Sequence, residues 1–350
     1  MVTLKNIAER VGVQESTVSR ILNRKTTSMK FASATIKKVE DAARELGYQP
    51  NASARALATR RTGYIGFILS DSVQGGWSNQ YFASNLAGAE RAARRRGYGL
   101  NISLYNLSNL ENFVFPKSIG QRSVDGIILC GPTEMSVVNK FSEAHIPVVQ
   151  IGANIAEEGA VPIVSFDTIE GYWKIARYCA HLGHKHMLLC ISDSKASMNK
   201  AQSFAAKLKE ESETSHMRLD FYIPPHGLID LNAAKPLISH WQSCDPVQRP
   251  TVILGSDQMM AGMTRELYAR GIRCPEDISL VSGTDTLICM LTNPSLTSIS
   301  YDLETIAEKA VYSLIDYLDN QREIPMLQML KGVCDGVVIE RESTGPAPVL

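Results

Sequence analysis

Short apolar runs alternate with amphipathic segments along most of the 350-residue chain, and this alternation constrains its fold more than any other feature. The amphipathic segments include 82–95 and 168–181. Alternation of this kind favours parallel sheets with helices on both faces. The alternation of apolar runs and amphipathic segments restarts after about residue 160, so we expect two lobes. The expected strands are Ile65–Leu69, Leu100–Leu104, Gly126–Cys130, Val148–Ile151, His186–Ile191, Val252–Leu254 and Ser279–Val281.

The amino-terminal residues follow a helical pattern instead. The apolar residues of 4–11 recur at helical spacing behind Thr3, which can cap a helix, and Gly12 breaks the run. A second run over 15–22 follows at once, and a third begins near Ser33. Two short helices that meet at a glycine turn are typical of a helix-turn-helix, although any small three-helix bundle gives the same spacing. The polar residues left for the outer face of the second helix are Glu15, Ser16, Thr17, Ser19, Arg20 and Asn23.

The formal net charge is zero, from 36 basic and 36 acidic residues, but the charge is unevenly distributed. Residues 1–62 carry five Lys and seven Arg against four Glu and one Asp, a net +7, so the remainder carries −7. A basic head on an acidic body fits a head that contacts a polyphosphate such as DNA. The alternative is that these basic residues serve solubility alone, as they do on many exposed helices.

A short Ala-rich segment links head and body. Pro50 ends the structure before it, and Asn51 can cap a helix after it. The segment spans only about two to three turns, too short for a stable isolated helix in water. We therefore expect it to fold only against a partner.

The residues 3–8, 12–13, 16–20, 23, 46–51, 54–55, 57 and 65–66 fall in one register. Together they resemble the amino-terminal pattern of the LacI family of bacterial transcription regulators. The resemblance implies a hinge helix that forms in the minor groove on DNA binding, with Leu57 wedged between base pairs; the alternative is that Leu57 is only a linker residue. It also implies DNA contacts by Thr3, Glu15, Ser16, Thr17, Ser19, Arg20, Asn23, Asn51, Ala54, Leu57 and Ala58.

Within that set, Glu15, Ser16 and Arg20 fall where the family contacts base edges. An Arg side chain can bind guanine through two hydrogen bonds, whereas a Glu side chain favours a cytosine amino group or rejects other bases and phosphate. The loop 23–34 is a few residues longer than is usual for the family. This insertion leaves the pose of the third helix open.

The body contains motifs at 125–128, 146–149, 182–184, 256–257, 271–272, 275–279 and 294–299. They resemble a periplasmic-binding-protein-like fold, in which the chain crosses between the lobes three times and a ligand lies between them, contacted from strand ends. Lys200 stands where many members have Arg, and Thr284 replaces an Asp of the family pattern. Neither side chain recognises sugar hydroxyls as the family residue does, so we expect a modified carbohydrate, another metabolite or a partner protein. Purely structural roles are the alternative. The implied effector contacts are Tyr81, Phe82, Lys200, Ser256, Asp257, Thr284, Asp285 and Tyr301.

The expected fold is α/β: a small all-α helix-turn-helix domain followed by a two-lobed periplasmic-binding-protein-like body of parallel sheets flanked by helices. The expected organisation is a DNA-binding domain at 1–49, a hinge helix and linker at 50–62, an amino-terminal lobe at 63–163 with 295–325, a carboxy-terminal lobe at 164–294 with 326–342, and a tail at 343–350.

We expect a homodimeric repressor that binds a pseudo-palindromic double-stranded DNA operator under control of a small-molecule effector. No apolar run is long enough for a membrane span or a signal peptide, so a cytoplasmic location is expected. No catalytic motif is present, and His181, His184 and His186 lie across a glycine turn, so we expect no enzymatic activity, cofactor or metal. The alternatives are a solute-binding protein without a DNA role and an enzyme that uses Asp257 or Asp285.

Overall fold

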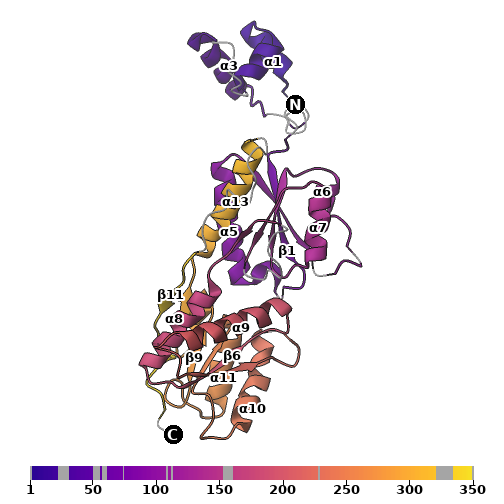
Figure 1. The fold of residues 1–350 in the computed structure, drawn as a ribbon. Coiled ribbons are helices and arrows are strands. Elements are labelled where there is room, and N and C mark those ends of the chain that lie inside the picture. The colour runs from indigo at the N-terminus through magenta and orange to yellow at the C-terminus, as the bar shows by residue number, and fades with distance from the viewer. Residues whose placement is uncertain are drawn as a thin grey trace. The chain divides into compact units, whose positions relative to one another are not determined.

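The chain divides into two compact units, Met1–Thr62 and Gly63–Leu350, and each is described by itself (Figure 1). Five of the residues expected to contact DNA lie outside the described part of the chain: Asn23, Asn51, Ala54, Leu57 and Ala58. The computed structural model describes residues 2–22, 31–49, 56, 61–73, 75–107, 109–111, 113–152, 161–227, 229–320 and 334–348.

In the first unit, local hydrogen bonds fix where α1 (Leu4–Val11) begins and ends. The Thr3 hydroxyl accepts a hydrogen bond from Asn6 N at 3.4 Å, and Asn6 Oδ1 accepts one from Thr3 N at 2.9 Å. Gly12 ends the helix at a φ of 75°, a left-handed conformation that glycine adopts without strain. These bonds satisfy amide groups that a helix end otherwise leaves without partners.

The helices α2 (Glu15–Leu22) and α3 (Ser33–Glu45) pack on α1. Ser33 is the first residue of α3, and the cap residue is Ala32, which has no side chain able to cap. The expected helix is therefore present, but its expected cap is one residue out of place. The core of this unit consists of Ile7, Ala8, Val18, Ile21, Val39 and Ala42.

The second unit contains two sheets. The first has five parallel strands in the order β2-β1-β3-β4-β5. Alternate residues of its strands face opposite layers: Phe67 packs toward α5 and α13, and Ile68 toward α6 and α7. The strands are β1 (Tyr64–Ser70), β2 (Gly99–Tyr105), β3 (Gly126–Cys130), β4 (Val148–Ile151) and β5 (Ile163–Val164). The covering helices are α5 (Gln80–Arg95), α6 (Lys117–Gly120), α7 (Met135–Glu143) and α13 (Leu303–Asp319), with a short turn η1 (Gly76–Ser78).

The second sheet has six strands in the order β11-β10-β9-β8-β6-β7, and only β11 runs antiparallel to its neighbour. Met187 packs toward α8 and α9, and Leu188 toward α10 and α11. The strands are β6 (His186–Cys190), β7 (Arg218–Tyr222), β8 (Val252–Gly255), β9 (Ser279–Ser282), β10 (Thr297–Ser300) and β11 (Val337–Ile339). The helices are α8 (Thr168–His181), α9 (Lys195–Glu210), α10 (Ala234–Ser243), α11 (Asp257–Ala269) and α12 (Leu287–Leu291), with η2 (Leu231–Ala233).

The chain passes between the two sheets three times. It leaves the first sheet after β5, returns after β10 to form α13, and enters the second sheet again as β11. α13 lies against α5 and closes the core of the first sheet (Figure 1). Arg91 of α5 bonds both Glu304 and Glu308 of α13, and Arg96 bonds Asp316 at 2.8 Å.

All seven strands expected from the sequence are present, and the expected α/β class with a small helical unit and two parallel sheets is confirmed. The expected helix over 168–181 coincides with α8. The sequence pattern missed β5, β7, β10 and β11.

Replacing Gly88 with Ala is expected to destabilise the second unit. A Cβ at Gly88 would overlap the backbone carbonyl oxygen of Glu304, and backbone cannot yield as a flexible side chain does. We expect the free energy of unfolding to fall by about 1–3 kcal/mol in urea titrations. Gly120→Ala is the matched control, because nothing lies within 4 Å of its Cβ position. Equal stability of the two variants would contradict the close packing of α5 on α13.

Candidate functional site

One face of α2 exposes polar side chains. Val18 and Ile21 are buried against the other helices, which leaves Glu15, Ser16 and Arg20 exposed and Thr17 and Ser19 half-buried. Five of the expected DNA-contacting residues therefore lie on one eight-residue helix. Hydroxyl, carboxylate and guanidinium groups on a short exposed helix suit contacts to base edges and phosphates in a major groove.

Thr3 has a structural role whether or not it contacts DNA. It is exposed, and its hydroxyl takes part in the capping box of α1. Glu15 and Arg20 likewise stand in the first and last turns of α2, where their charges complement the helix dipole.

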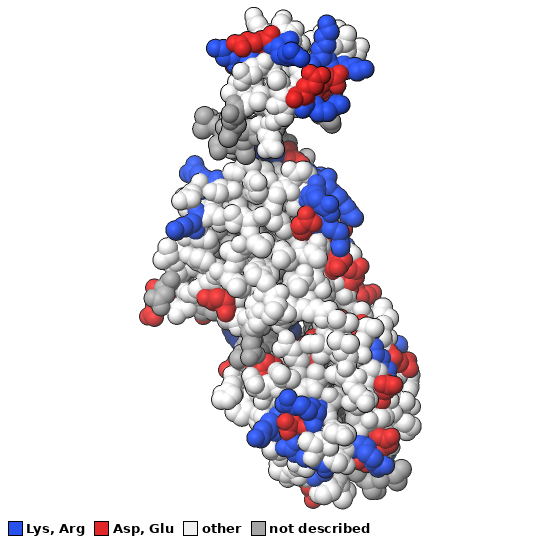
Figure 2. Space-filling view, turned by 180° about the vertical axis from the view of Figure 1, so that it is seen from behind, with Lys and Arg blue, Asp and Glu red and all other residues white. Residues whose placement is uncertain are grey.

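The positive charge of the first unit is not concentrated on its described helices. Residues 2–22 and 31–49 carry six Lys and Arg side chains against five Asp and Glu side chains. Figure 2 shows basic and acidic groups interspersed on this unit. The excess of basic charge belongs to 24–30 and 55–61, and of the residues that supply it only Arg61 is described.

A cavity of about 370 Å³ lies between the two sheets of the second unit. Its wall is formed where parallel strands end: Gly131 follows β3, Gly152 follows β4, Ser192 lies just after β6, and Gly283 follows β9. The carboxyl ends of strands in open α/β sheets are where such folds bind ligands, and this volume suits a small metabolite.

Aromatic rings form the wall of the cavity on the side of the first sheet. Tyr81 meets Phe82 edge to face at 4.9 Å between ring centroids, and Phe166 lies 6.4 Å from Tyr81. Burial raises the pKa of the Tyr81 hydroxyl far above its usual value, so this group stays neutral. Tyr81 and Phe82 therefore line the cavity as expected from the sequence.

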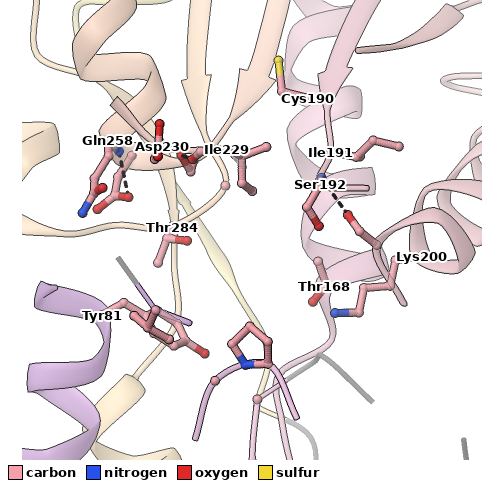
Figure 3. A pocket seen from close by; sticks show the side chains of 18 of the residues that line it. Tyr81, Thr168, Cys190, Ile191, Ser192, Lys200, Ile229, Asp230, Gln258 and Thr284 are labelled. Atoms are coloured by element: carbon pink, nitrogen blue, oxygen red, sulfur yellow. Dashed lines mark hydrogen bonds between the residues drawn. The ribbon is translucent and has the colours of Figure 1, made fainter. Parts of the chain in front are cut away.

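The polar wall opposite includes Lys200 of α9 and Thr168 at the start of α8 (Figure 3). Burial lowers the pKa of Lys200 to about 8, because the charged ammonium loses contact with water. The hydroxyl oxygen of Thr168 is buried and has no hydrogen-bond partner in the described structure. Lys200 is the one cationic side chain among the described residues of the wall.

Ser256 and Asp257 line the cavity but also hold local structure together. The Ser256 hydroxyl caps α11 and donates to the carbonyl oxygen of Ile229. The Asp257 carboxylate accepts from the Thr286 hydroxyl at 2.5 Å and from the backbone N–H of Gln258 at 2.8 Å. Thr284, in contrast, projects its side chain toward the cavity (Figure 3).

The two remaining expected effector contacts do not line the cavity. Asp285 accepts from Arg341 at 2.8 Å and from the Ser298 hydroxyl at 2.7 Å, so it ties β9 to the end of the chain. Tyr301 is buried one layer behind the wall and stacks on Phe166 with centroids 3.9 Å apart.

The lobes also touch at the edge of the site. The side-chain oxygen of Gln80, at the start of α5, accepts a hydrogen bond from Leu287 N at 2.9 Å, at the start of α12. This bond joins an element of the first sheet to one of the second.

Sequence reasoning missed several residues of the wall. They occupy loops just past strand ends or first turns of helices, and their common feature is this position rather than a motif. The missed polar residues are Ser72, Asn79, Thr168, Ser192, Ser197, Asp230 and Gln258.

The three neighbouring histidines have separate partners. His184 bonds Thr251, His186 bonds Asp220 at 2.9 Å, and His181 pairs with Glu213. No three His, Cys, Asp or Glu side chains of the described chain are placed to share a metal ion. Among the described helices, none is both long and apolar enough to cross a membrane.

Asp285→Asn is expected to lower stability rather than ligand affinity. Its partner Arg341 is largely buried, so loss of the charge leaves a buried guanidinium uncompensated, at a cost of about 3–5 kcal/mol in the free energy of unfolding. The matched variant Asp316→Asn breaks an exposed pair with Arg96 and is expected to cost under about 1 kcal/mol. A folded Asp285→Asn variant that loses effector binding in calorimetry would instead favour a binding role.

Comparison with known proteins supports both units. Residues 3–51 match the model of "Bacterial regulatory proteins, lacI family", and residues 176–344 match "Periplasmic binding protein-like domain".

Relatives and solved structures agree along the whole chain. The chain is 26% identical over 322 residues to the probable HTH-type transcriptional repressor ExuR of Bacillus subtilis (strain 168), covering 91% of this chain and 92% of that protein. It is 26% identical to the ribose operon repressor of Escherichia coli (strain K12), covering 98% and 100%. Its fold is similar to that of the Lac repressor dimer bound to operator and the anti-inducer ONPF, with a TM-score of 0.75, 22% identity, and 98% and 99% of the chains covered. Residues 3–51 are therefore a DNA-binding domain of the lacI family of bacterial regulatory proteins, joined to a periplasmic-binding-protein-like domain, and the chain is a DNA-binding transcription regulator.

Proposed function

We propose that this regulator is a homodimeric repressor that binds a pseudo-palindromic operator and changes its DNA affinity when an effector occupies the cavity between the sheets. The polar face of α2 is the observation that carries the proposal, because its exposed side chains are of the types that read base edges. The relatives named as repressors support repression, rather than activation, of transcription. A solute-binding role without DNA leaves the lacI-family head unexplained.

The small size of the helix proposed to contact bases, α2, favours a dimer. One eight-residue helix contacts only a few base pairs, and two-fold related copies give a site of useful specificity. The similar Lac repressor structure is a dimer on its operator. The described surface offers an apolar patch for self-association on α12, where Leu287, Met290 and Leu291 are 50%, 62% and 74% exposed.

The proposed cellular setting follows from the role. A repressor acts where the chromosome is, so we propose a cytoplasmic location. The relatives are transcription regulators, and binding of an effector is sufficient to explain the cavity. We therefore propose that the chain is not an enzyme.

Selection from random double-stranded DNA at a stated salt concentration tests the proposal directly. We expect enrichment of a pseudo-palindromic site by the purified full-length chain, alone or with a metabolite mixture. Enrichment of an asymmetric site would contradict dimeric recognition, and failure to enrich any sequence under both conditions would contradict the proposed function.

Arg20→Ala is expected to relax specificity at one base pair of each half-site. Loss of a two-bond contact to a base costs about 1–3 kcal/mol of discrimination. Binding to operators substituted at each position, measured by fluorescence anisotropy, checks this. Arg10→Ala is the control on α1, where Arg10 pairs with Glu45. Uniform weakening on all sequences would show that Arg20 contacts phosphate instead.

Leu57→Ala is expected to weaken operator binding far more than non-specific binding. An apolar wedge between base pairs helps only where the duplex is kinked at a specific site. Leu57 lies outside the described residues, so this proposal rests on the family resemblance. Parallel titrations with operator and random duplex measure both affinities, and equal losses on the two would contradict a wedge.

A further inference from the structure

The first backbone amide of α12 has a hydrogen-bond partner on the other lobe. Thr286 precedes the helix, but its side chain makes no capping bond and donates to Asp257 instead. A side-chain cap reaches only the second or third amide of a helix, so the first amide, Leu287 N, bonds either to water or to a more distant group. Here the acceptor is the side-chain oxygen of Gln80, at 2.9 Å.

Gln80 is held in place as the first residue of α5. Asn79, just before it, caps this helix by accepting a hydrogen bond from Tyr81 N at 3.1 Å. The helix in turn packs closely on α13, where Gly88 has no room for a side chain. The acceptor therefore moves together with the core of the first lobe, whereas the donor belongs to the second.

Both ends of the bond between Gln80 and Leu287 stand next to the wall of the cavity. On the first lobe, Asn79 and Tyr81 flank Gln80 in the chain and line the cavity. On the second lobe, Thr284 lines the cavity in the loop that leads to α12. Tyr81 and Thr284 lie on opposite sides of the cavity (Figure 3). A ligand that changes the separation of these two walls must therefore also change the bond.

The bond differs from the contacts among the connecting segments. Those segments meet through Phe166, Tyr301 and Cys334, at the place where the chain passes between the lobes. Contacts at such a place persist when the lobes turn about the segments. Gln80 and Leu287 belong instead to helices of the two lobes, so their bond forms in one lobe arrangement and is lost when the lobes separate.

We infer that Gln80 is a latch between the lobes, whose hydrogen bond to Leu287 N stabilises one lobe arrangement and thereby sets the DNA affinity of the regulator. The inference rests on the proposed function and names a residue that controls it. One hydrogen bond of this kind shifts an equilibrium by about two- to tenfold. An effector acts by adding to this preference or by opposing it.

Four substitutions separate the bond from its surroundings. Gln80→Ala removes the acceptor. Leu287→Pro removes the donor at the first position of a helix, which proline favours, and Thr286 already has the extended backbone, with φ −118° and ψ 171°, that suits a residue before proline. Leu287→Ala is the matched control, because it shortens the same side chain and keeps the N–H. Gln80→Glu charges the acceptor and is expected to strengthen the bond.

Distances between the lobes test the latch without DNA. Spin-labelled non-canonical residues are placed at Val114 on the first lobe and Val247 on the second, which are 70% and 78% exposed. Labelled chains are diluted with unlabelled ones, so that a dimer carries a single labelled pair.

Pulsed electron spin resonance then gives the distribution of distances in the full-length chain. We expect Gln80→Ala and Leu287→Pro to raise the ratio of separated to approached lobes by about two- to tenfold, Gln80→Glu to lower it, and Leu287→Ala to leave it unchanged. The same distribution in all variants overturns the inference.

Operator affinity then connects the latch with DNA binding. In fluorescence anisotropy with the operator selected by the unmodified chain, we expect Gln80→Ala and Leu287→Pro to change the affinity in the same direction, by about two- to tenfold. The double variant is expected to match either single variant, because both substitutions remove one bond. Gln80→Glu is expected to act in the opposite direction, which a general loss of stability does not produce. Additive effects, or an affinity that stays constant while the lobe distances change, overturn the inference.

Failure of the latch and failure of the proposed function give different results. If the unmodified chain selects no operator, the proposed function fails, and the control of DNA affinity fails with it. If an operator is selected but the lobe distances do not respond to Gln80, the latch alone fails.

Discussion

The packing of α13 on α5 is the constraint on which the second unit depends. α13 follows β10 of the second sheet, yet it supplies much of the apolar layer that covers the first. The contact is close enough that Gly88 has no room for a side chain. Neither lobe can be completed by a continuous piece of chain, so the connecting segments must run side by side. Phe166 and Tyr301 stack where two of these segments meet, and Phe166 also pairs with Cys334 of the third.

This arrangement of helices and sheets determines where a ligand can bind. Helices cover both faces of each sheet, so side chains on the faces of the inner strands are buried in cores, whereas strand ends line the cavity. The same strand ends are where helices begin, and helix starts need caps. Ser256 and Asp257 show the result: side chains at the right place for a ligand are already bonded to the protein.

The sequence predicted those strands and helices that a local residue pattern defines. Buried parallel strands are continuous apolar runs, so Gly126–Cys130 was evident, whereas β7, with Arg218 and Asp220 at the sheet edge, has no such run. The family resemblance named Tyr81, Phe82, Lys200 and Thr284, and the structure places these four side chains along the cavity, while their contact with an effector stays a prediction. The resemblance did not distinguish Thr284, which lines the cavity, from Asp285, which does not. Adjacent residues point in different directions, and the partner of Asp285 is Arg341, which is far along the chain. Thr168 was missed because its setting depends on how α8 packs on α9.

An effector can alter DNA binding only through contacts that differ between lobe arrangements. The structure contains a candidate for such a contact in the bond from Leu287 N to Gln80, which joins elements of the two sheets and sits next to Tyr81 of the cavity wall. A ligand that contacts both lobes favours the same approach of the lobes. Because coupling is reciprocal, operator DNA that favours one lobe arrangement must change effector affinity by the same factor. Under the proposed function, effector binding at the cavity wall and operator binding by the polar face of α2 are therefore two readouts of one conformational equilibrium.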